Sequence, residues 1–241
     1  MAVPARPLSE LGFPAVEAFL QEKGSSVYFH EGVQFLKPRG NSFGLATRSG
    51  RDFTGDALIF AVPPSSLGML WPKETWPFAG SFLKMGKSPI VSLHLILEKP
   101  VMEGHFLGLP GAKFEWVFNR NANWDWKGEG QYLSFTASAA DELSRLKDSE
   151  LIDLALREMK ERCPAAQEIR VLHAKATREM GATFVWSKET DALRPACETP
   201  FPGVFLAGDW TDTGLPATIE GACFSGHLAA EKVKEYLRKT S

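Results

Sequence analysis

The sequence predicts a mixed α/β fold in two parts, one built on a parallel sheet and one on a mixed sheet. Residues 204–207 are a short apolar run closed by Gly208, which is typical of a strand buried on both faces of a parallel sheet. Residues 90–97 alternate between apolar and polar, as in a half-buried strand. With 241 residues, 44% hydrophobic and 23% charged, the chain can bury roughly 70% of its unfolded surface in one or two domains.

The first group of expected elements begins with a helix over residues 13–23. Val16, Phe19 and Leu20 recur at helical spacing, so we expect them to face inward, and Gly24 ends the helix. Turns rich in Gly, Asn and Asp then separate four expected strands, at residues 26–29, 33–37, 44–47 and 57–62. The Pro63-Pro64 pair ends this group.

The middle of the chain, residues 65–187, mixes strands with one long helix. Strands are expected at residues 90–97, 114–119, 131–137 and 169–176. In the first of these, His94 lies opposite the apolar face, so we expect it to be exposed or hydrogen-bonded, with a proton-relay role as the alternative. The helix covers residues 149–162 and ends at Cys163-Pro164. Asp148 or Ser149 would cap it, and its expected buried residues are Ile152, Ala155, Leu156 and Met159.

In the last part, an acidic turn follows the buried strand. Asp209 lies just past the carboxyl end of that strand, where open α/β sheets bind ligands. Pro216 is expected to open the next helix, because its ring fixes φ and its missing amide would have no partner there. The amides of Ala217, Thr218 and Ile219 would then point outward at the positive end of the helix dipole, where an electron-rich group is stabilised.

The helix after this turn carries rows of small residues. One row is formed by Ala217, Gly221, Ser225 and Ala229, and a parallel row by Ala222, Gly226 and Ala230. Each of the two glycines costs roughly 1 kcal/mol of helix stability relative to Ala. Such residues are favoured where another backbone or a flat ligand comes close.

The run from Leu206 to Ala222 resembles the carboxyl-terminal FAD motif of the amine oxidase and phytoene desaturase superfamily. Within it, the sequence is most similar to the squalene-associated FAD-dependent desaturases, understood as hydroxysqualene dehydroxylases. Six further segments resemble the same family in the same order, so the similarity covers essentially the whole chain. They begin at Pro7, Leu58, Pro89, Gln131, Arg178 and Asp191.

The resemblance implies a Rossmann-like FAD/NAD(P)-binding domain that is incomplete, joined to a mixed-sheet substrate domain of the amine oxidase type. Residues 1–64 and 191–241 would belong to the FAD-binding domain, and residues 65–190 to the substrate domain, with the apolar face of its sheet as a tunnel roof over the flavin. The implied FAD contacts are a backbone contact to adenine at Val33, the pyrophosphate near Gly208, a ribityl hydroxyl at Asp209, and the flavin edge at Pro216, Ala217, Thr218 and Ile219.

Other residues have weaker or ambiguous roles in this comparison. Arg178 is a candidate for the active-site mouth, with a salt bridge or a solvated pair with Glu179 as the default interpretation. Glu220 is favourable in a first helical turn by about 0.3–1 kcal/mol without any function. Cys223, Phe224 and Met180 replace residues that in relatives are usually Val, Arg and a basic residue, which argues against mechanisms that need a cation at the last two positions.

The Gly-x-Gly-x-x-Gly run that opens such a cofactor domain is not found in the sequence. We therefore expect the chain to begin after the pyrophosphate-binding half. A truncated polypeptide, a split gene product and an incomplete reading frame remain open as explanations. We also expect the isolated chain to self-associate or to need a complementary amino-terminal chain, because its parallel strand would lack central neighbours.

The implied activity is the reductive dehydroxylation of hydroxysqualene to squalene, in hopanoid and squalene biosynthesis alongside enzymes similar to squalene synthase. One alternative is a carotenoid (phytoene) desaturase or a flavin amine oxidase. Another, of a different class, is a non-catalytic fragment that acts as a lipid-binding or assembly module. The polyisoprenoid substrate implies peripheral membrane contact.

Composition argues against several other classes. A net charge of −2 without a Lys/Arg cluster gives no reason to expect nucleic-acid binding. The three cysteines are odd in number and lack metal-ligand spacing, so we expect reduced thiols, no metal site and a cytoplasmic protein, with contact at the inner face of the membrane. We find no apolar segment of signal-peptide or membrane-spanning type.

Overall fold

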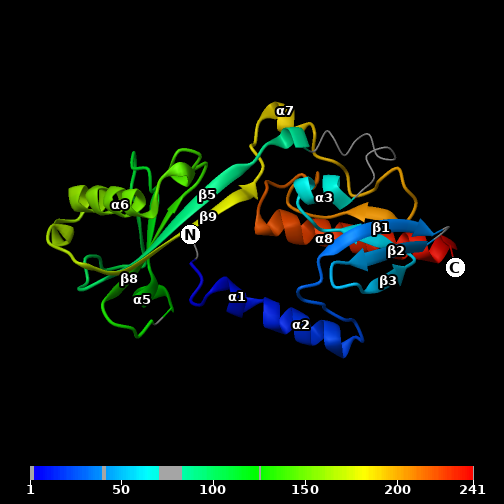
Figure 1. Ribbon diagram of the computed structural model, residues 1–241, viewed down its shortest axis with the longest axis horizontal. Coiled ribbons are helices and arrows are strands. Elements are labelled where there is room, and N and C mark those ends of the chain that lie inside the picture. Colours follow the sequence, from blue (N-terminus) through cyan, green and yellow to red (C-terminus); the bar gives the residue numbers. More distant parts are fainter. Residues whose placement is uncertain (1–2, 40–41, 71–82, 125, 241) are drawn as a thin grey trace. The chain divides into compact units, whose positions relative to one another are not determined.

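The computed structural model describes residues 3–39, 42–70, 83–124 and 126–240 (Figure 1). It divides into two compact units, which we call unit 1 (residues 1–27 and 88–182) and unit 2 (residues 28–87 and 183–241). These boundaries differ from the three blocks expected from the sequence: residues 1–27 group with the central sheet, and residues 65–87 and 183–190 with the carboxyl-terminal part. The assignment of the blocks to cofactor and substrate stays a prediction.

Unit 1 is built on a five-stranded sheet with the order β6-β7-β8-β5-β9. Its strands are β5 (Ser88–Leu97), β6 (Phe106–Gly108), β7 (Trp116–Asn119), β8 (Gln131–Ala137) and β9 (Val171–Thr183). β5 alternates between buried and partly buried residues along its whole length, which confirms the expected half-buried strand. β8 has its expected bounds, and β9 extends seven residues beyond residue 176, where the prediction ended.

One face of this sheet is covered by helix α6 (Asp148–Arg162). Val91, Leu93, Leu95 and Leu97 of β5 pack in one buried cluster with Leu151, Ala155 and Met159 of the helix. Figure 1 shows α6 on one side of the sheet and the short helix α5 (Arg120–Trp124) on the other. α6 therefore occupies the face that carries these four residues, and the expectation that an apolar sheet face roofs a tunnel stays a prediction.

Two details of α6 differ from expectation. The cap is Lys147, whose amide donates to Glu150 Oε2 at 2.7 Å, and neither Asp148 nor Ser149 caps the helix. Leu151 and Glu158 are buried, whereas Ile152 and Leu156 are only partly buried. The cause is Glu158, which accepts bonds from the amides of Lys113 (2.6 Å) and Phe114 (3.1 Å) and so fixes which side of the helix faces inward.

The remaining helices of unit 1 are α1 (Leu8–Leu11) and α2 (Phe13–Glu22), with 3-10 turns η2 (Leu143–Arg145) and η3 (Pro164–Ala166). α2 forms as expected, but the prediction that Val16 and Phe19 face inward is wrong: they are 53% and 56% exposed. None of the described residues buries this side of α2, and the Lys23 ammonium lies 5.5 Å from the centre of the Phe19 ring.

Unit 2 contains the antiparallel sheet β1-β2-β3 and a parallel pair, β4 and β10. Its elements are β1 (Val33–Arg39), β2 (Ser42–Thr47), β3 (Asp52–Gly55), β4 (Leu58–Phe60), α3 (Pro64–Leu70), η1 (Leu83–Met85), α7 (Lys188–Asp191), β10 (Val204–Leu206) and α8 (Ile219–Thr240). The expected strand at residues 26–29 is absent. β3 was not expected, because its sequence is rich in Asp, Thr and Gly, which have no strong strand preference. α3 was not expected either, because the proline pair was interpreted as the end of a strand, whereas Pro64 begins this helix.

Candidate cofactor-binding corner

The corner begins at the carboxyl ends of the parallel strands β4 and β10. Val204 pairs with Leu58 and Leu206 with Phe60, and the amide of Ala207 donates to the Phe60 carbonyl at 2.9 Å. All three β10 residues are buried. This confirms the strand expected at residues 204–207, which is buried and parallel, so Asp209 lies where such sheets bind ligands.

Gly208 turns the chain out of the strand. Its φ of +140° is a conformation that L side chains rarely adopt, and a Cβ there would lie 2.5 Å from Trp210 Nε1. Its amide donates to Ser225 Oγ at 2.7 Å, and its carbonyl accepts from the Thr211 hydroxyl at 2.8 Å. Trp210 is buried and donates from Nε1 to the Val62 carbonyl at 3.1 Å, so this tryptophan has a structural role. Only a glycine fits this position.

Arg194 holds the loop that follows. Its Nη2 lies within hydrogen-bonding distance of three carbonyl oxygens, those of Thr211 (2.6 Å), Leu215 (2.9 Å) and Asp209 (3.2 Å). Its Nη1 contacts Asp191 Oδ1 at 3.3 Å, and its side chain is only 6% exposed. A planar guanidinium presents several donors in a rigid fork, which suits this task. Sequence analysis assigned no role to Arg194, although it belongs to the Asp191 segment used for the resemblance.

The start of α8 differs from expectation. Pro216 does not open the helix, because Ile219 is its first residue. Thr218 caps it: its hydroxyl accepts from the Gly221 amide at 3.2 Å and its carbonyl from the Ala222 amide at 2.9 Å. The cap satisfies the third amide of the helix. The amides of Ile219 and Glu220 have no bond to any described residue and remain available to a ligand.

The small-residue row of α8 faces inward, as expected. Gly221, Ser225 and Ala229 are buried. A Cβ on Gly221 would lie 2.6 Å from the Pro216 carbonyl oxygen, so a close backbone approach explains this glycine. A Cβ on Gly226 would meet no atom within 4 Å, so the described residues give no packing reason for that one.

Asp209 is half-buried at the entrance of the corner. Burial raises the pKa of its carboxyl, while its own amide, the Arg194 cation and the Trp210 amide act in the opposite direction. Because the side chain is half-buried, its charged form is less well hydrated than in water. A hydrogen-bond donor on a ligand would offset that cost.

The other predicted site residues are spread over the two units. Val33 is partly buried at the start of β1, opposite Thr47, in the same unit as the corner. Pro216 and Thr218 are exposed, Ala217 packs against the unit 2 core, and Ile219 is 70% exposed. Their contacts to FAD stay predictions.

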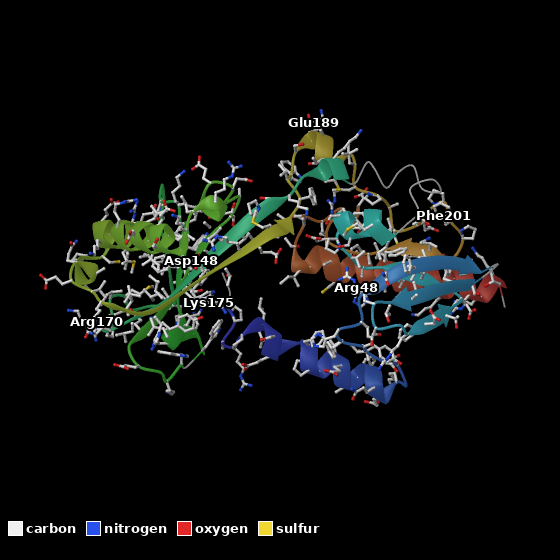
Figure 2. The ribbon with its side chains drawn as sticks, in the orientation of Figure 1. Arg48, Asp148, Arg170, Lys175, Glu189 and Phe201 are labelled. Carbon is white, nitrogen blue, oxygen red and sulfur yellow. The ribbon has the colours of Figure 1, made fainter. Side chains whose placement is uncertain are left out.

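Arg178 lies in unit 1 and makes structural contacts. Its Nη2 donates to Asp148 Oδ1 and to the Leu146 carbonyl, both at 2.7 Å, which ties β9 to the start of α6, where Figure 2 labels Asp148. This geometry agrees with the default interpretation of a salt bridge, although the partner is Asp148 and not Glu179. A role at an active-site mouth stays a prediction.

The corner fits a flavin nucleotide in its donor chemistry. Arg194 Nε is buried and has no partner among the described residues. Gly208 turns the backbone sharply at the end of the strand. Two first-turn amides of α8 are available, and the Asp209 carboxyl is half-buried. Such donors suit the electron-rich edge of a flavin, and Asp209 suits a hydroxyl. In the parts of the chain that the structure describes, we find no cluster of His, Cys, Asp and Glu able to hold a metal, and no helix long and apolar enough to cross a membrane.

Comparison with known proteins identifies the family of the chain. Residues 12–234 match the family model described as flavin containing amine oxidoreductase. A hydroxysqualene dehydroxylase of Rhodopseudomonas palustris is 35% identical over 228 residues, which cover 91% of this chain and 49% of that protein. A 15-cis-phytoene desaturase of an Oncidium hybrid is 25% identical over 260 residues, covering 91% of this chain and 44% of that protein. The chain thus spans about half the length of these relatives.

A solved structure supports the fold. An oxidoreductase from Methanosarcina mazei superposes with a TM-score of 0.67 at 19% identity, covering 90% of this chain and 53% of that one. The chain therefore has the same fold as this protein, which confirms the mixed α/β class expected from the sequence. The family match over residues 12–234 shows that the chain belongs to the family of flavin containing amine oxidoreductases.

Proposed function

We propose that this chain contributes the carboxyl-terminal part of an FAD site to an oxidoreductase that converts hydroxysqualene to squalene. The observation that supports this most directly is the corner at Gly208 and Asp209, clamped by Arg194 in front of the start of α8. The 35% identity to a hydroxysqualene dehydroxylase supports the choice of substrate.

In this proposal the chain's own residues bind and orient. Asp209 would accept a hydrogen bond from a ribityl hydroxyl, and the amides of Thr218 and Ile219 would face the flavin N1 and C2 carbonyl edge, where the helix dipole stabilises negative charge. The backbone of Gly208 and Asp209 would lie near the pyrophosphate, Pro216 and Ala217 would line the flavin edge, and Val33 would contact adenine through its backbone. Bound FAD would supply hydride chemistry. The reaction replaces an allylic carbon–oxygen bond with a carbon–hydrogen bond and releases water.

The test uses the longest product of the gene that contains these 241 residues. Anaerobic incubation with FAD, dithionite and hydroxysqualene is expected to give squalene by gas chromatography and mass spectrometry. Oxidation of phytoene would favour the desaturase suggested by the 25% identity to plant phytoene desaturases, and peroxide released from a soluble amine would favour an amine oxidase. A purified protein that stays colourless with excess FAD would contradict the proposal and favour the non-catalytic alternative.

The remaining expectations on partners belong to the same proposal. Ile219 and Phe224 are 70% and 43% exposed on α8, and Ile59 is 39% exposed on β4. These apolar residues support self-association or binding of a complementary chain, which light scattering tests: a stable monomer at high concentration would contradict it. Peripheral contact of a cytoplasmic protein with the inner membrane face, as a polyisoprenoid substrate requires, is tested by liposome co-sedimentation. Coupling to squalene-synthase-like enzymes is tested by co-purification.

A further inference from the structure

A second candidate site lies in unit 1, on the sheet face that α6 does not cover. A cavity of about 380 Å³ is lined by side chains from β5, β8 and β9 and by Trp126. Ligand sites commonly have volumes of about 300–1,000 Å³. The lining residues are His94, Ile96, Trp126, Tyr132, His173, Ala174, Lys175 and Thr177. Figure 2 labels Lys175 on β9.

Every polar side chain that lines this cavity can donate a hydrogen bond. The Nδ1 atom of His94 lies 3.0 Å from the hydroxyl oxygens of both Tyr132 and Ser134. Hydroxyls that donate to Nδ1 place the ring proton on Nε2, so His94 then offers an N–H donor of its own. Lys175 adds an ammonium, and His173 a second imidazole; both are exposed. Among the described residues, no carboxylate lines the cavity.

Positive charge near the cavity is not neutralised. Burial, and then the cations of Arg120 and Lys175, lower the pKa of His94. Burial also lowers the pKa of Arg120, whose guanidinium carbon lies 4.0 Å from the centre of the Trp124 ring. Among the described residues, no carboxylate forms an ion pair with Arg120 or Lys175.

Two donors beside the cavity lack partners. Arg120 Nε and Trp124 Nε1 are buried and bond to no described residue. Trp124 packs edge-on against Tyr132, which lines the cavity, with ring centres 6.3 Å apart. Arg120 and Trp124 themselves lie outside the lining, so they add positive charge and unpaired donors to its surroundings and not to its surface.

The same face also offers an apolar surface. Phe118 lies opposite Ser134 in the ladder, and Ser134 lies opposite His94, so these three side chains share one face. Phe118 stacks on Trp116, and Phe106 contacts both, with ring centres 6.0–6.5 Å apart. Phe106 and Trp116 are each 39% exposed. An apolar chain that leaves the cavity would find these rings beside it.

We propose that this cavity binds the phosphate or diphosphate group of an ester that carries an apolar chain, with Lys175, His173 and His94 as donors to the phosphate oxygens and Trp126 against the chain. The proposal does not depend on the FAD site, which lies in unit 2. Phosphate is preferred over a neutral hydroxyl because the lining combines several donors with positive charge and no carboxylate.

The test is calorimetric titration, at fixed ionic strength, with inorganic pyrophosphate and with a C15 prenyl diphosphate. We expect saturable one-to-one binding of both, tighter for the prenyl ester. Lys175→Gln and His173→Gln should each weaken both ligands by about tenfold, the value of one charge-assisted hydrogen bond. Trp126→Ala should weaken only the prenyl ester. Lys239→Gln, an exposed lysine in unit 2, is the matched charge control and should bind as the parent protein does.

Further measurements separate a specific site from general attraction. Saturation with pyrophosphate should raise the pKa of His94 in an NMR titration, because a bound anion stabilises the imidazolium. Lys175 and His173 are exposed, so their variants should keep the parent urea transition. The proposal is overturned if neither ligand binds, or if Lys175→Gln binds both ligands as tightly as the parent does. It is also overturned if Lys239→Gln loses as much affinity as Lys175→Gln. A co-sedimentation experiment in which the protein binds vesicles of anionic phospholipid, but neither soluble ligand, would likewise contradict it.

Discussion

The guanidinium of Arg194 donates from Nη2 to the carbonyl oxygen of Thr211 at 2.6 Å. The same nitrogen lies 2.9 Å from the carbonyl of Leu215. One buried side chain therefore sets the path of the loop between the strand β10 and the helix α8, and the position of Asp209 depends on it.

Replacement of Arg194 by Met should destabilise the chain by about 3 kcal/mol, because several buried carbonyl oxygens lose their donor. Arg194→Lys should lose less stability than Arg194→Met, because an ammonium keeps the charge and part of the hydrogen bonding. It should still be less stable than the parent, because an ammonium cannot reach all three carbonyl oxygens. Urea unfolding measures both. Arg238→Met, on the exposed end of α8, is the control. If Arg194→Met unfolds at the same midpoint as this control, the clamp contributes little.

The two glycines of α8 should respond in opposite ways to alanine. Gly226→Ala should stabilise by about 0.5–1 kcal/mol, because it removes the helix cost of glycine and meets no atom within 4 Å. Gly221→Ala should destabilise by about 1–3 kcal/mol, because its Cβ would lie 2.6 Å from the Pro216 carbonyl oxygen. Thermal unfolding compares the pair. Equal shifts for both variants would contradict the close approach at Gly221.

Asp209 should lower the stability of the ligand-free protein at neutral pH. Its pKa in the folded chain is raised, so its contribution to stability is present below the unfolded value of 3.8 and is lost as pH rises through the folded value. Asp209→Asn should therefore unfold at a higher temperature than the parent at pH 7, and the difference should shrink as pH falls toward 4. The variant should also bind FAD more weakly, as fluorescence quenching would show. A variant less stable than the parent at pH 7 would contradict this assignment.

His94 should give the opposite dependence on pH. Its pKa is lowered in the folded chain, so the unfolded chain takes up a proton first as pH falls below the ordinary imidazole pKa of 6.5. The unfolding free energy of the parent should fall from pH 7 to pH 5 more steeply than that of His94→Gln. Denaturant titrations at both values measure the difference. Parallel pH profiles would show that His94 titrates normally.

Strong local patterns made much of the fold predictable. The alternation in β5, the apolar run of β10 and the amphipathic α6 each depend on neighbouring residues, and each was located within a few positions. β3 was missed because its strand character comes only from pairing with β2. The exposure of Val16 and Phe19 was also unpredictable, because helical spacing indicates an apolar face without showing what covers it.

The local geometry of the corner was partly predictable, but the side chains that support it were not, and its binding of FAD stays a prediction. Gly208, Asp209 and the inward row of α8 follow from residue type and spacing. Arg194 did not, because its role depends on three carbonyl groups that only the folded loop brings together. The start of α8 was misplaced by three residues, from Pro216 to Ile219, since a proline before a helix is compatible with more than one starting point.

The bonds of Arg194 join residues at most 21 positions apart in sequence. Closing so short a loop costs little chain entropy, and contacts of this kind form early and quickly. The loop held by Arg194 can therefore form from its own stretch of chain, whereas the corner is complete only when β10 pairs with β4 and Trp210 contacts Val62, which spans 148 positions. A nucleotide would then bind to a loop that is already ordered. The affinity for the nucleotide would therefore not be reduced by the entropy of ordering that loop.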